Sequence, residues 1–360
     1  MTLSLVTAGE SHGPALVGIV SGLPAGLVVD RAAVDADLAR RQEGYGRSPR
    51  QKLERDAVEV LAGLRHGRTL GTPLALVVRN RDHKNWTWGM SPWPPEGEPE
   101  GKGTKPVTLP RPGHADLAGT MKYGHADARN ALERASARQT AIAVAAGAVA
   151  KALLAEIGVE VGGRVATEEL ERRIDEARAE RDTVGGVVEV VARGVPPGLG
   201  SYASKEDRLD ARLAAELMGI QAVKGVEIGA GFELAGRRGS EAHDEIVADA
   251  DGALYRETNF AGGIEAGVSN GEEVVVRAAM KPLPTLMRPL RSVDLESGEP
   301  GEALVERSDV AAVEALAVVA EAAVAFELAR AAREKFGGDA LEDFVATHRA
   351  YVERIPWRTR

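Results

Sequence analysis

The sequence contains no cysteine. A chain without thiols cannot be a disulfide-stapled scaffold, a thiolate zinc or iron–sulfur protein, or an enzyme with a cysteine nucleophile. Aromatic residues make up only 4% of it, and it has neither a P-loop nor a G-x-G-x-x-G pattern, so a nucleotide-binding Rossmann fold has no support. No motif has the spacing of a metal site either. What remains is a chain of 360 residues with 44% hydrophobic and 28% charged residues, the balance of an ordinary globular protein.

Long hydrophobic runs are also missing. The longest uncharged stretches are rich in Ala and Val and are shorter than the roughly 20 apolar residues of a membrane span. The first ten residues, MTLSLVTAGE, have neither a basic region nor a cleavable apolar segment. We therefore expect a cytoplasmic protein that does not associate with membranes.

The charge is acidic overall but locally basic. A net charge of −9 argues against a nucleic-acid-binding protein. The basic residues are 35 Arg and only 10 Lys, which suits bidentate binding of oxyanions, although GC-rich coding also favours Arg. Six basic residues against two glutamates lie between positions 40 and 55: Arg40, Arg41, Arg47, Arg50, Lys52 and Arg55. This cluster predicts a site for a small anion.

Short β-like runs and Ala-rich helical patterns interleave along the chain, without the regular spacing of βαβ units. This pattern favours one large α/β or α+β domain over residues 1–360. Strands are expected at 3–7, 16–20, 58–64, 73–78, 187–191, 226–234 and 273–280. Helices are expected at 30–42, 127–157, 167–181, 206–218, 309–335 and 341–351, with Asp30, Thr167 and Asp309 as N-caps.

A long loop is expected over residues 80–116. It contains seven prolines and several glycines, and connections of this length are usually functional or disordered. Its middle, at about 90–110, is the segment that we expect to be mobile. Its ends hold His83, Trp86, Trp88, Arg111 and His114, which favours ordered ends.

The motif GESHG, residues 9–13, fits the G-x-S-x-G nucleophile elbow of the α/β hydrolases. Only eight residues precede Gly9, however, and the elbow requires earlier strands. Adjacent side chains on an extended segment point in opposite directions, so Ser11 and His12 do not form a dyad. A polar surface turn remains the plainer alternative for His12.

Other motifs also allow two interpretations. RPGHAD presents Arg111 and His114 at the end of the long loop, or it is a solvated turn in which Asp116 caps the next segment. Arg134 and Arg138 lie four residues apart and are expected to share a helix face, where they either face an anion or form a surface stripe with Glu133.

Two later segments are also candidates for a functional role. KPLPT, residues 281–285, is a stiff segment with a Lys and a Thr that could hold a phosphate. Asp309, taken alone, is better explained as an N-cap than as a base.

Together these motifs resemble the chorismate synthase family. The blocks GESHG, LARRQEGYGR, NRDHKNW, LPRPGHADLAGTMKYGHADARNALERASARQTA, QAVKGVEIG, NFAGGIEAGVSNG, AAMKPLPT and ERSDVAAVEALAVVAEAA match that family in its order and span residues 7–330. The resemblance implies an α+β fold, a β-α-β sandwich with helices between antiparallel sheets, and a homotetramer. The resemblance therefore favours antiparallel sheets over the doubly wound parallel sheet that an α/β domain would have.

The resemblance also implies the reaction. The family converts 5-enolpyruvylshikimate 3-phosphate to chorismate and phosphate by a 1,4-anti elimination, the last step of the shikimate pathway, and it requires reduced FMN without net redox change. No reductase domain is evident, so we expect the monofunctional type, which depends on an external flavin reductase. A flavin-binding relative that has lost catalysis would lack His12, His114 or Asp309, and this chain has all three.

The family's functional residues carry over by position. His12 matches the acid that protonates the leaving phosphate, and His114 matches a histidine thought to protonate the reduced flavin. Asp309 matches the aspartate that removes the proton, acting through flavin N5, while Ser11 and Ser136 match a relay of serines. Arg41 and Arg47 match substrate positions that the family also assigns to a pyridine nucleotide, and Arg50 is expected to assist.

The FMN positions carry over in the same way. They are Arg134, Ala135, Ser136, Gln221, Ala222, Ala266, Lys281, Pro282, Leu283, Pro284, Thr285 and Arg307. Ala266 stands where many members have Gly, so its methyl group could crowd the flavin slightly.

Overall fold

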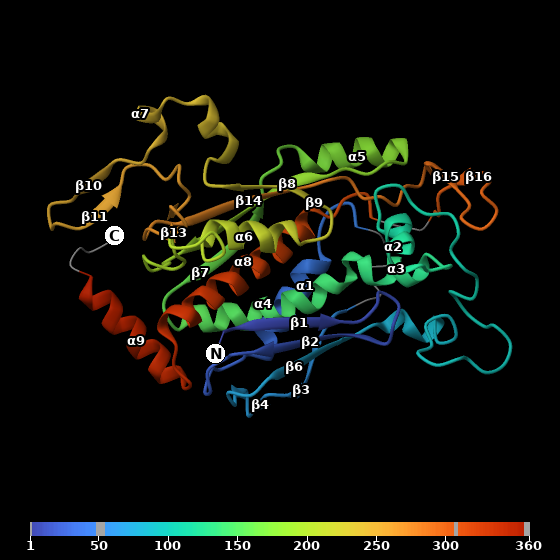
Figure 1. Cartoon of the computed structure of the whole chain (residues 1–360), viewed down its shortest axis with the longest axis horizontal. Helices are drawn as coiled ribbons and strands as arrows, with labels where there is room; N and C mark the ends of the chain where they lie inside the picture. Colours follow the sequence, from blue (N-terminus) through green and yellow to red (C-terminus); the bar gives the residue numbers. More distant parts are fainter. Residues whose placement is uncertain (1, 48–54, 306–308, 356–360) are drawn as a thin grey trace.

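Two four-stranded antiparallel sheets enclose a layer of helices in the computed structural model, which describes residues 2–47, 55–305 and 309–355 (Figure 1). The first sheet has the order β1 (Ser4–Ala8), β2 (Ala15–Ser21), β6 (Leu74–Arg79) and β3 (Val58–Ala62). The second has the order β7 (Glu160–Val165), β8 (Gly186–Arg193), β14 (Val274–Met280) and β9 (Val223–Ile228). The expected α+β arrangement with helices between antiparallel sheets is confirmed.

Period-two patterning places one face of each sheet against the helices. Every second residue of β2 is buried, including Leu16 and Val20, and β14 alternates in the same way through Val274 and Val276. Alternation of this kind is what an antiparallel strand with one covered face requires. The inward side chains of both sheets belong to one continuous hydrophobic core.

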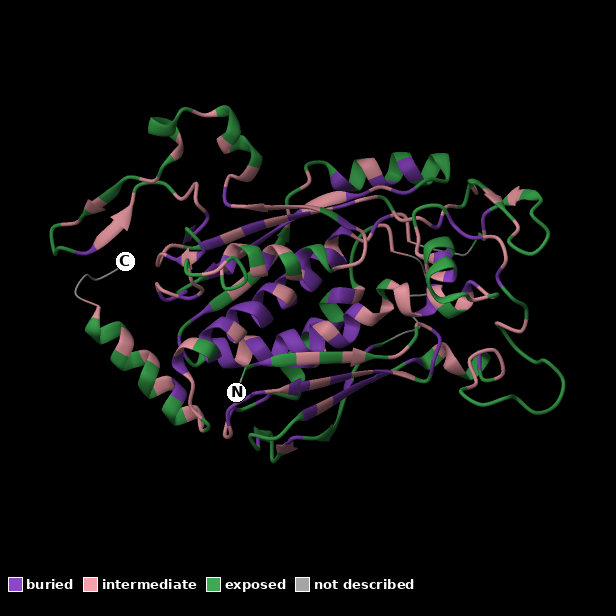
Figure 2. Ribbon diagram, viewed as in Figure 1, coloured by how far each residue is buried: buried purple, intermediate pink, exposed green. Residues whose placement is uncertain are grey.

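Four helices form the middle layer: α1 (Arg31–Gln42), α4 (Thr140–Ala155), α6 (Leu209–Met218) and α8 (Val313–Phe336). Figure 2 shows that buried residues concentrate in this layer. The helices α4 and α8 are rich in Ala, which lets their backbones approach closely. A Cβ atom added to Gly147 of α4 would lie 2.4 Å from the Cβ atom of Ala322 in α8. The expected N-cap of α1 is confirmed, because Asp30 Oδ1 accepts a hydrogen bond from the Ala32 N–H at 2.9 Å.

The remaining elements are short or peripheral. They are β4 (Leu64–Arg65), β5 (Arg68–Thr69), η2 (Arg81–Asn85), α2 (Asp116–Tyr123), α3 (Arg129–Ala135), η3 (Ala137–Gln139), α5 (Leu170–Glu180), η4 (Gly231–Gly236), α7 (Gly239–Ala242), β10 (Ile246–Ala248), β11 (Leu254–Arg256), β12 (Ile264–Glu265), β13 (Val268–Ser269), β15 (Arg291–Val293), β16 (Pro300–Glu302) and α9 (Leu341–Arg354). The strand expected over 226–234 is therefore wrong in its second half, which is the 3₁₀ helix η4.

The continuous helix expected over 127–157 is wrong. Ser136 adopts an extended backbone with ψ of 142° and separates α3 from η3 and α4. Its hydroxyl oxygen accepts a hydrogen bond from the Arg138 N–H at 3.2 Å, so the serine caps the segment that follows. The stretch Arg129–Ala155 is long and apolar enough by composition to cross a membrane, but 67% of its most apolar window is buried inside the protein.

Two other expected caps are also wrong. The Thr167 hydroxyl accepts from the Val187 N–H of β8 at 2.6 Å, and α5 begins only at Leu170. The helix α8 begins at Val313, four residues after Asp309. The Asp309 carboxylate instead lies 2.9 Å from Arg47 Nη1, so an ion pair with a distant segment takes the place of the cap.

The long loop over 80–116 has anchored ends. It opens with η2, and the buried Trp86 donates its indole N–H to Asp82 at 2.9 Å. Val107 is buried near its other end. Between them, most residues from 94 to 104 are exposed.

The close approach of α4 and α8 generates a test of the fold. Gly147→Ala gains helix propensity, worth up to about 1 kcal/mol. The new methyl group, however, must push back the Ala322 backbone, and overpacking of this kind typically costs about 1–3 kcal/mol. We expect a net loss of stability, measured as a lower urea midpoint at unchanged slope.

Gly162→Ala is the matched control, because Gly162 is exposed in β7 and an added Cβ would meet nothing within 4 Å. Its urea midpoint should stay near that of the parent protein. A Gly147→Ala protein as stable as this control would show that the two helices do not depend on the close contact.

Candidate active site

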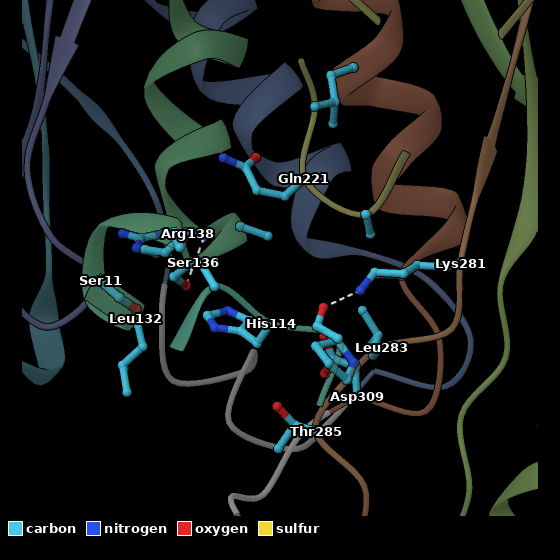
Figure 3. Close-up of a pocket in the computed structure, with 18 of the residues that line it drawn as sticks. Ser11, His114, Leu132, Ser136, Arg138, Gln221, Lys281, Leu283, Thr285 and Asp309 are labelled. Atoms are coloured by element: carbon cyan, nitrogen blue, oxygen red, sulfur yellow. Dashed lines mark hydrogen bonds between the residues drawn. The ribbon is translucent and has the colours of Figure 1, made fainter. Parts of the chain in front are cut away.

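A cavity of about 560 Å³ opens between the two halves of the sandwich, at the end of the helical layer where α3 and η3 lie. This volume is in the range of small-molecule sites. Figure 3 shows Ser136 and Arg138 on one side of it, Lys281 on the opposite side and His114 between them. The wall thus combines the loop after β1, the break between α3 and α4, the end of the long loop, and the segments next to β9 and β14.

The charge of the lining is strongly positive. Among the described residues that line the cavity, Asp309 is the single acidic side chain. Six basic side chains surround it: Arg41, Arg47, Arg111, Arg138, Lys224 and Lys281. Such a cavity in an acidic protein is suited to a small anion with several charged groups.

Buried Asp56 holds two of these arginines together. Its Oδ2 lies 2.6 Å from Arg138 Nη1 and 3.6 Å from Arg41 Nη1. Arg41 also donates from Nε to the Thr140 hydroxyl at 2.8 Å. Burial lowers the pKa of Arg41 to about 10, opposed by Asp56 and assisted by the positive charges of Arg138 and Arg47. The guanidinium therefore stays charged at neutral pH.

Arg47 has an unsatisfied donor. Its Nη1 pairs with Asp309, but its buried Nε has no hydrogen-bond partner among the described residues. A buried guanidinium N–H without an acceptor is costly, and an anion in the cavity would satisfy it. Arg50 lies outside the described residues.

His12 is a buried residue, so the surface alternative is wrong. Its ring stacks on Trp86 with 4.0 Å between ring centroids. Its Nδ1 lies 2.9 and 3.0 Å from the two carboxylate oxygens of Glu133, and its backbone N–H donates to Glu133 at 2.9 Å. Glu133 is therefore an inward partner of His12 and not part of a surface stripe.

His114 is held in a similar way. Its Nδ1 lies 2.5 Å from Oδ1 of fully buried Asp116, which also accepts from the backbone N–H and the side chain of Arg111. Burial acts to raise the pKa of the Asp116 carboxyl, but the hydrogen bonds from His114 and Arg111 bring it far below its usual value. The alternatives of a solvated turn and a capping aspartate are both wrong. Arg111 also donates to the Thr285 hydroxyl at 3.1 Å, which ties this turn to the segment after β14.

Arg134 and Arg138 do not share a helix face, because the chain breaks between them. Arg134 donates to the carbonyl oxygens of Thr7 and Gly9, at 3.0 and 3.2 Å, and lies outside the cavity lining. Only Arg138 faces the cavity.

The remaining candidates divide into three groups. Those that line the cavity are Ser11, Ala135, Ser136, Gln221, Ala222, Lys281, Leu283, Pro284, Thr285 and Asp309. Pro282 and Ala266 do not line it, and Ala266 occupies the tight turn between β12 and β13 at a φ of 50°. Arg307 lies outside the described residues.

The segment around Lys281 closes the cavity. The Lys281 backbone N–H donates to the Ala222 carbonyl at 3.0 Å, and its Nζ donates to the Gly113 carbonyl. Burial, and then the nearby charge of Lys224, lowers the pKa of Lys281. Ala222 holds a φ of 70°, a conformation that non-glycine residues rarely adopt and that concentrates at functional sites.

Several contributors were missed by the sequence reasoning. Asp56 belongs to no motif, and Lys224 stands unremarked within the QAVKG block. Glu133 and Asp116 were considered only as surface or capping groups. Asp116 stands two residues after His114 and could have been tested as an orienting carboxylate, whereas Glu133 lies 121 residues from His12 and has no local signal for this role.

Comparisons with known proteins identify the family of the chain. The sequence model of the chorismate synthase family matches residues 3–167 and 164–332. The chorismate synthase of Rubrobacter xylanophilus is 55% identical, covering 99% of this chain and 98% of its own length, and that of Desulforudis audaxviator is 54% identical with 98% of each covered. A crystal structure of chorismate synthase superposes with a TM-score of 0.77 at 37% identity and 98% coverage of both chains.

Family match, near full-length relatives and a common fold lead to the same conclusion: the chain belongs to the chorismate synthase family.

Proposed function

We propose that the basic cavity is where this chain converts 5-enolpyruvylshikimate 3-phosphate to chorismate and phosphate, the last step of the shikimate pathway. The observation that carries the proposal is the set of six cations and two carboxylate-held histidines around one cavity. The substrate has two carboxylates and a phosphate, and the reaction releases that phosphate as an anion. Arginine forks and lysine ammonium groups are the natural partners of such a ligand.

We assign substrate binding to Arg41 and Arg47, with Arg50 as a further candidate. The buried Nε of Arg47 supplies a donor that a substrate oxyanion would satisfy. Binding there would compete with the Arg47–Asp309 ion pair. Release of Asp309 from that pair would leave a carboxylate beside the substrate that can accept a proton.

We assign proton transfer to His12 and His114. Each has Nδ1 beside a carboxylate, and we assign the exchange of a proton with the ligand to Nε2. We assign protonation of the leaving phosphate to His12 and protonation near the cofactor to His114. Ser11 and Ser136 line the same wall and can relay protons through their hydroxyl groups.

The lining also fits FMN. Ala135, Ser136 and Ala222 are small lining residues on which a planar ring can lie against the backbone, and Lys281 adds a cation across the cavity from Ser136. We propose that Gln221, Leu283, Pro284 and Thr285 complete this wall, that Arg307 adds a charge, and that Arg134, Pro282 and Ala266 support it from outside the lining. Reduced FMN supplies electron density that eases departure of the phosphate, with no net redox change.

The remaining features of the proposal concern the whole protein. The chain acts as one domain over residues 1–360, because one hydrophobic core joins both sheets. The exposed part of the loop at about 90–110 closes over bound ligand. We further propose a cytoplasmic homotetramer that receives reduced flavin from an external reductase and binds neither nucleic acid nor membranes.

The reaction itself is tested anaerobically. Protein, dithionite-reduced FMN and the enolpyruvyl substrate should form chorismate, followed by its absorbance. Oxidised FMN should give no product, with or without NADPH, because we assign no reductase to this chain. Turnover on NADPH and oxidised FMN alone would refute the monofunctional assignment.

The histidine roles are tested by substitution. His12→Ala and His114→Ala should each lower kcat by about 10²–10⁴-fold, the usual contribution of a general acid, with FMN affinity little changed. His125→Ala serves as the control, because His125 does not line the cavity. Full activity in either cavity variant would remove that residue from the mechanism.

Lys281 predicts a pH dependence of FMN binding. A bound anion favours the protonated lysine, and the lowered pKa means that the free protein loses this charge at a lower pH than an ordinary lysine would. Affinity should be full at neutral pH and should fall as pH rises through that lowered pKa.

Fluorescence titration of FMN between pH 7 and 10 measures this fall. Lys281→Arg keeps its charge over the range, so its affinity should fall less steeply than that of the parent protein. The same pH dependence in both proteins would exclude Lys281 as an FMN-binding cation.

A further inference from the structure

Glu133 is a buried carboxylate that contacts His12 but is assigned no part in binding substrate or FMN. It lies on α3, is only 2% exposed, and does not line the cavity. It nevertheless makes three contacts with His12, two to the ring and one to the backbone. The desolvation of a buried carboxylate has to be offset by what it binds, and most of the hydrogen bonds of the Glu133 carboxylate are made with His12.

We propose that Glu133 is the positioning residue for His12. Its carboxylate fixes His12 as the tautomer with the proton on Nδ1 and stabilises the imidazolium, so that Nε2 is the atom that exchanges a proton with the ligand in the cavity. This inference rests on the proposed role of His12 as the acid.

The tautomer follows from donor and acceptor chemistry. An ionised carboxylate can only accept hydrogen bonds, and both of its oxygens lie within 3.0 Å of His12 Nδ1. Nδ1 must therefore carry the hydrogen. Burial acts to raise the pKa of the Glu133 carboxyl, but hydrogen bonds and charge from His12, together with Arg129, bring it below its usual value. The carboxyl group is consequently ionised at neutral pH.

The ring plane is fixed by independent contacts. Trp86 stacks on the His12 ring at an interplanar angle of 22°, and Trp86 is itself held by Asp82. The His12 carbonyl lies 2.9 Å from His83 Nδ1, which anchors the backbone at the same point. With ring plane and Nδ1 both fixed, the direction of Nε2 is fixed as well.

The charges that face His12 determine the direction in which the pH–rate profile should move when Glu133 loses its charge. Glu133 is the anion in contact with the ring. Arg129 lies beside it, 3.3 Å from Glu133 and over the Trp86 ring at 5.1 Å, and the cavity adds cations such as Arg41 and Arg138. Without the Glu133 charge, the imidazolium would face mainly cations, and the charged form of the ring would be less favoured.

The test compares Glu133→Gln with the parent protein in the anaerobic assay. We expect kcat to fall about 10–100-fold, as when other orienting carboxylates are removed, with KM and FMN affinity within about twofold. The limb of the pH–rate profile on which activity declines with rising pH should move to lower pH. Glu133→Asp keeps the negative charge, so its activity should decline with rising pH over the same range as that of the parent protein.

Two controls separate positioning from folding. Glu189→Gln removes a buried carboxylate of the second sheet that pairs with Arg164 and Arg277, and its pH profile should match the parent. The ¹⁵N signals of His12 in the parent protein, assigned by their loss in His12→Ala, should show the Nδ1–H tautomer. This readout needs no Glu133 variant to fold.

The outcomes distinguish this inference from the function on which it rests. Full activity in His12→Ala would refute the role of His12 itself. If His12→Ala is impaired but Glu133→Gln keeps the parent kcat and pH limb, or His12 shows the Nε2–H tautomer, the positioning role is overturned. Glu133→Gln should have little further effect on kcat in the His12→Ala background, and a full additional loss there would also overturn it.

Discussion

The contact of Asp56 with Arg41 and Arg138 is the constraint on which the site depends. Two guanidinium groups in a mostly buried wall repel each other unless a carboxylate lies between them, and Asp56, which stands between the two arginines in the sequence, supplies it. Its own backbone N–H is held by Gln42 at 2.9 Å, which ties it to the end of α1. The positive charge of the cavity is thus assembled during folding, before any ligand arrives.

Carboxylates also hold other side chains of the cavity, in the same way that Asp56 holds the two arginines. His12 is paired with Glu133, His114 with Asp116, and Arg47 with Asp309. A carboxylate thereby holds each of these side chains in one orientation, and of the three pairs only Arg47–Asp309 has both members in the cavity lining. A ligand in the cavity can reach both members of that pair, so the proposed function couples substrate binding to the separation of Asp309 from Arg47.

The residue pattern left the fold open between α/β and α+β, and the family resemblance supplied the layers. The motif blocks that carry the resemblance include most cavity residues, because they lie in loops that the two sheets bring to one end. Sequence reasoning failed where long-range contacts override local patterns. An Ala-rich stretch predicts one helix, but the extended backbone of Ser136 interrupts it. Arg134 therefore donates to the Thr7 carbonyl of β1 and does not share a face with Arg138. Asp309 stands where an N-cap is expected, but Arg47, distant in sequence, takes its carboxylate. Asp56 carries no local signal at all, because its role exists only once α1 and η3 have come together.

A crystal structure with FMN and the enolpyruvyl substrate bound tests the central claim most directly. The account predicts both molecules side by side in this cavity, with substrate oxygens on Arg41 and Arg47, and with Nε2 of His12 and His114 directed at the ligands. Asp309 should have moved away from Arg47. Ligands bound elsewhere, or an intact Arg47–Asp309 pair beside bound substrate, would contradict it.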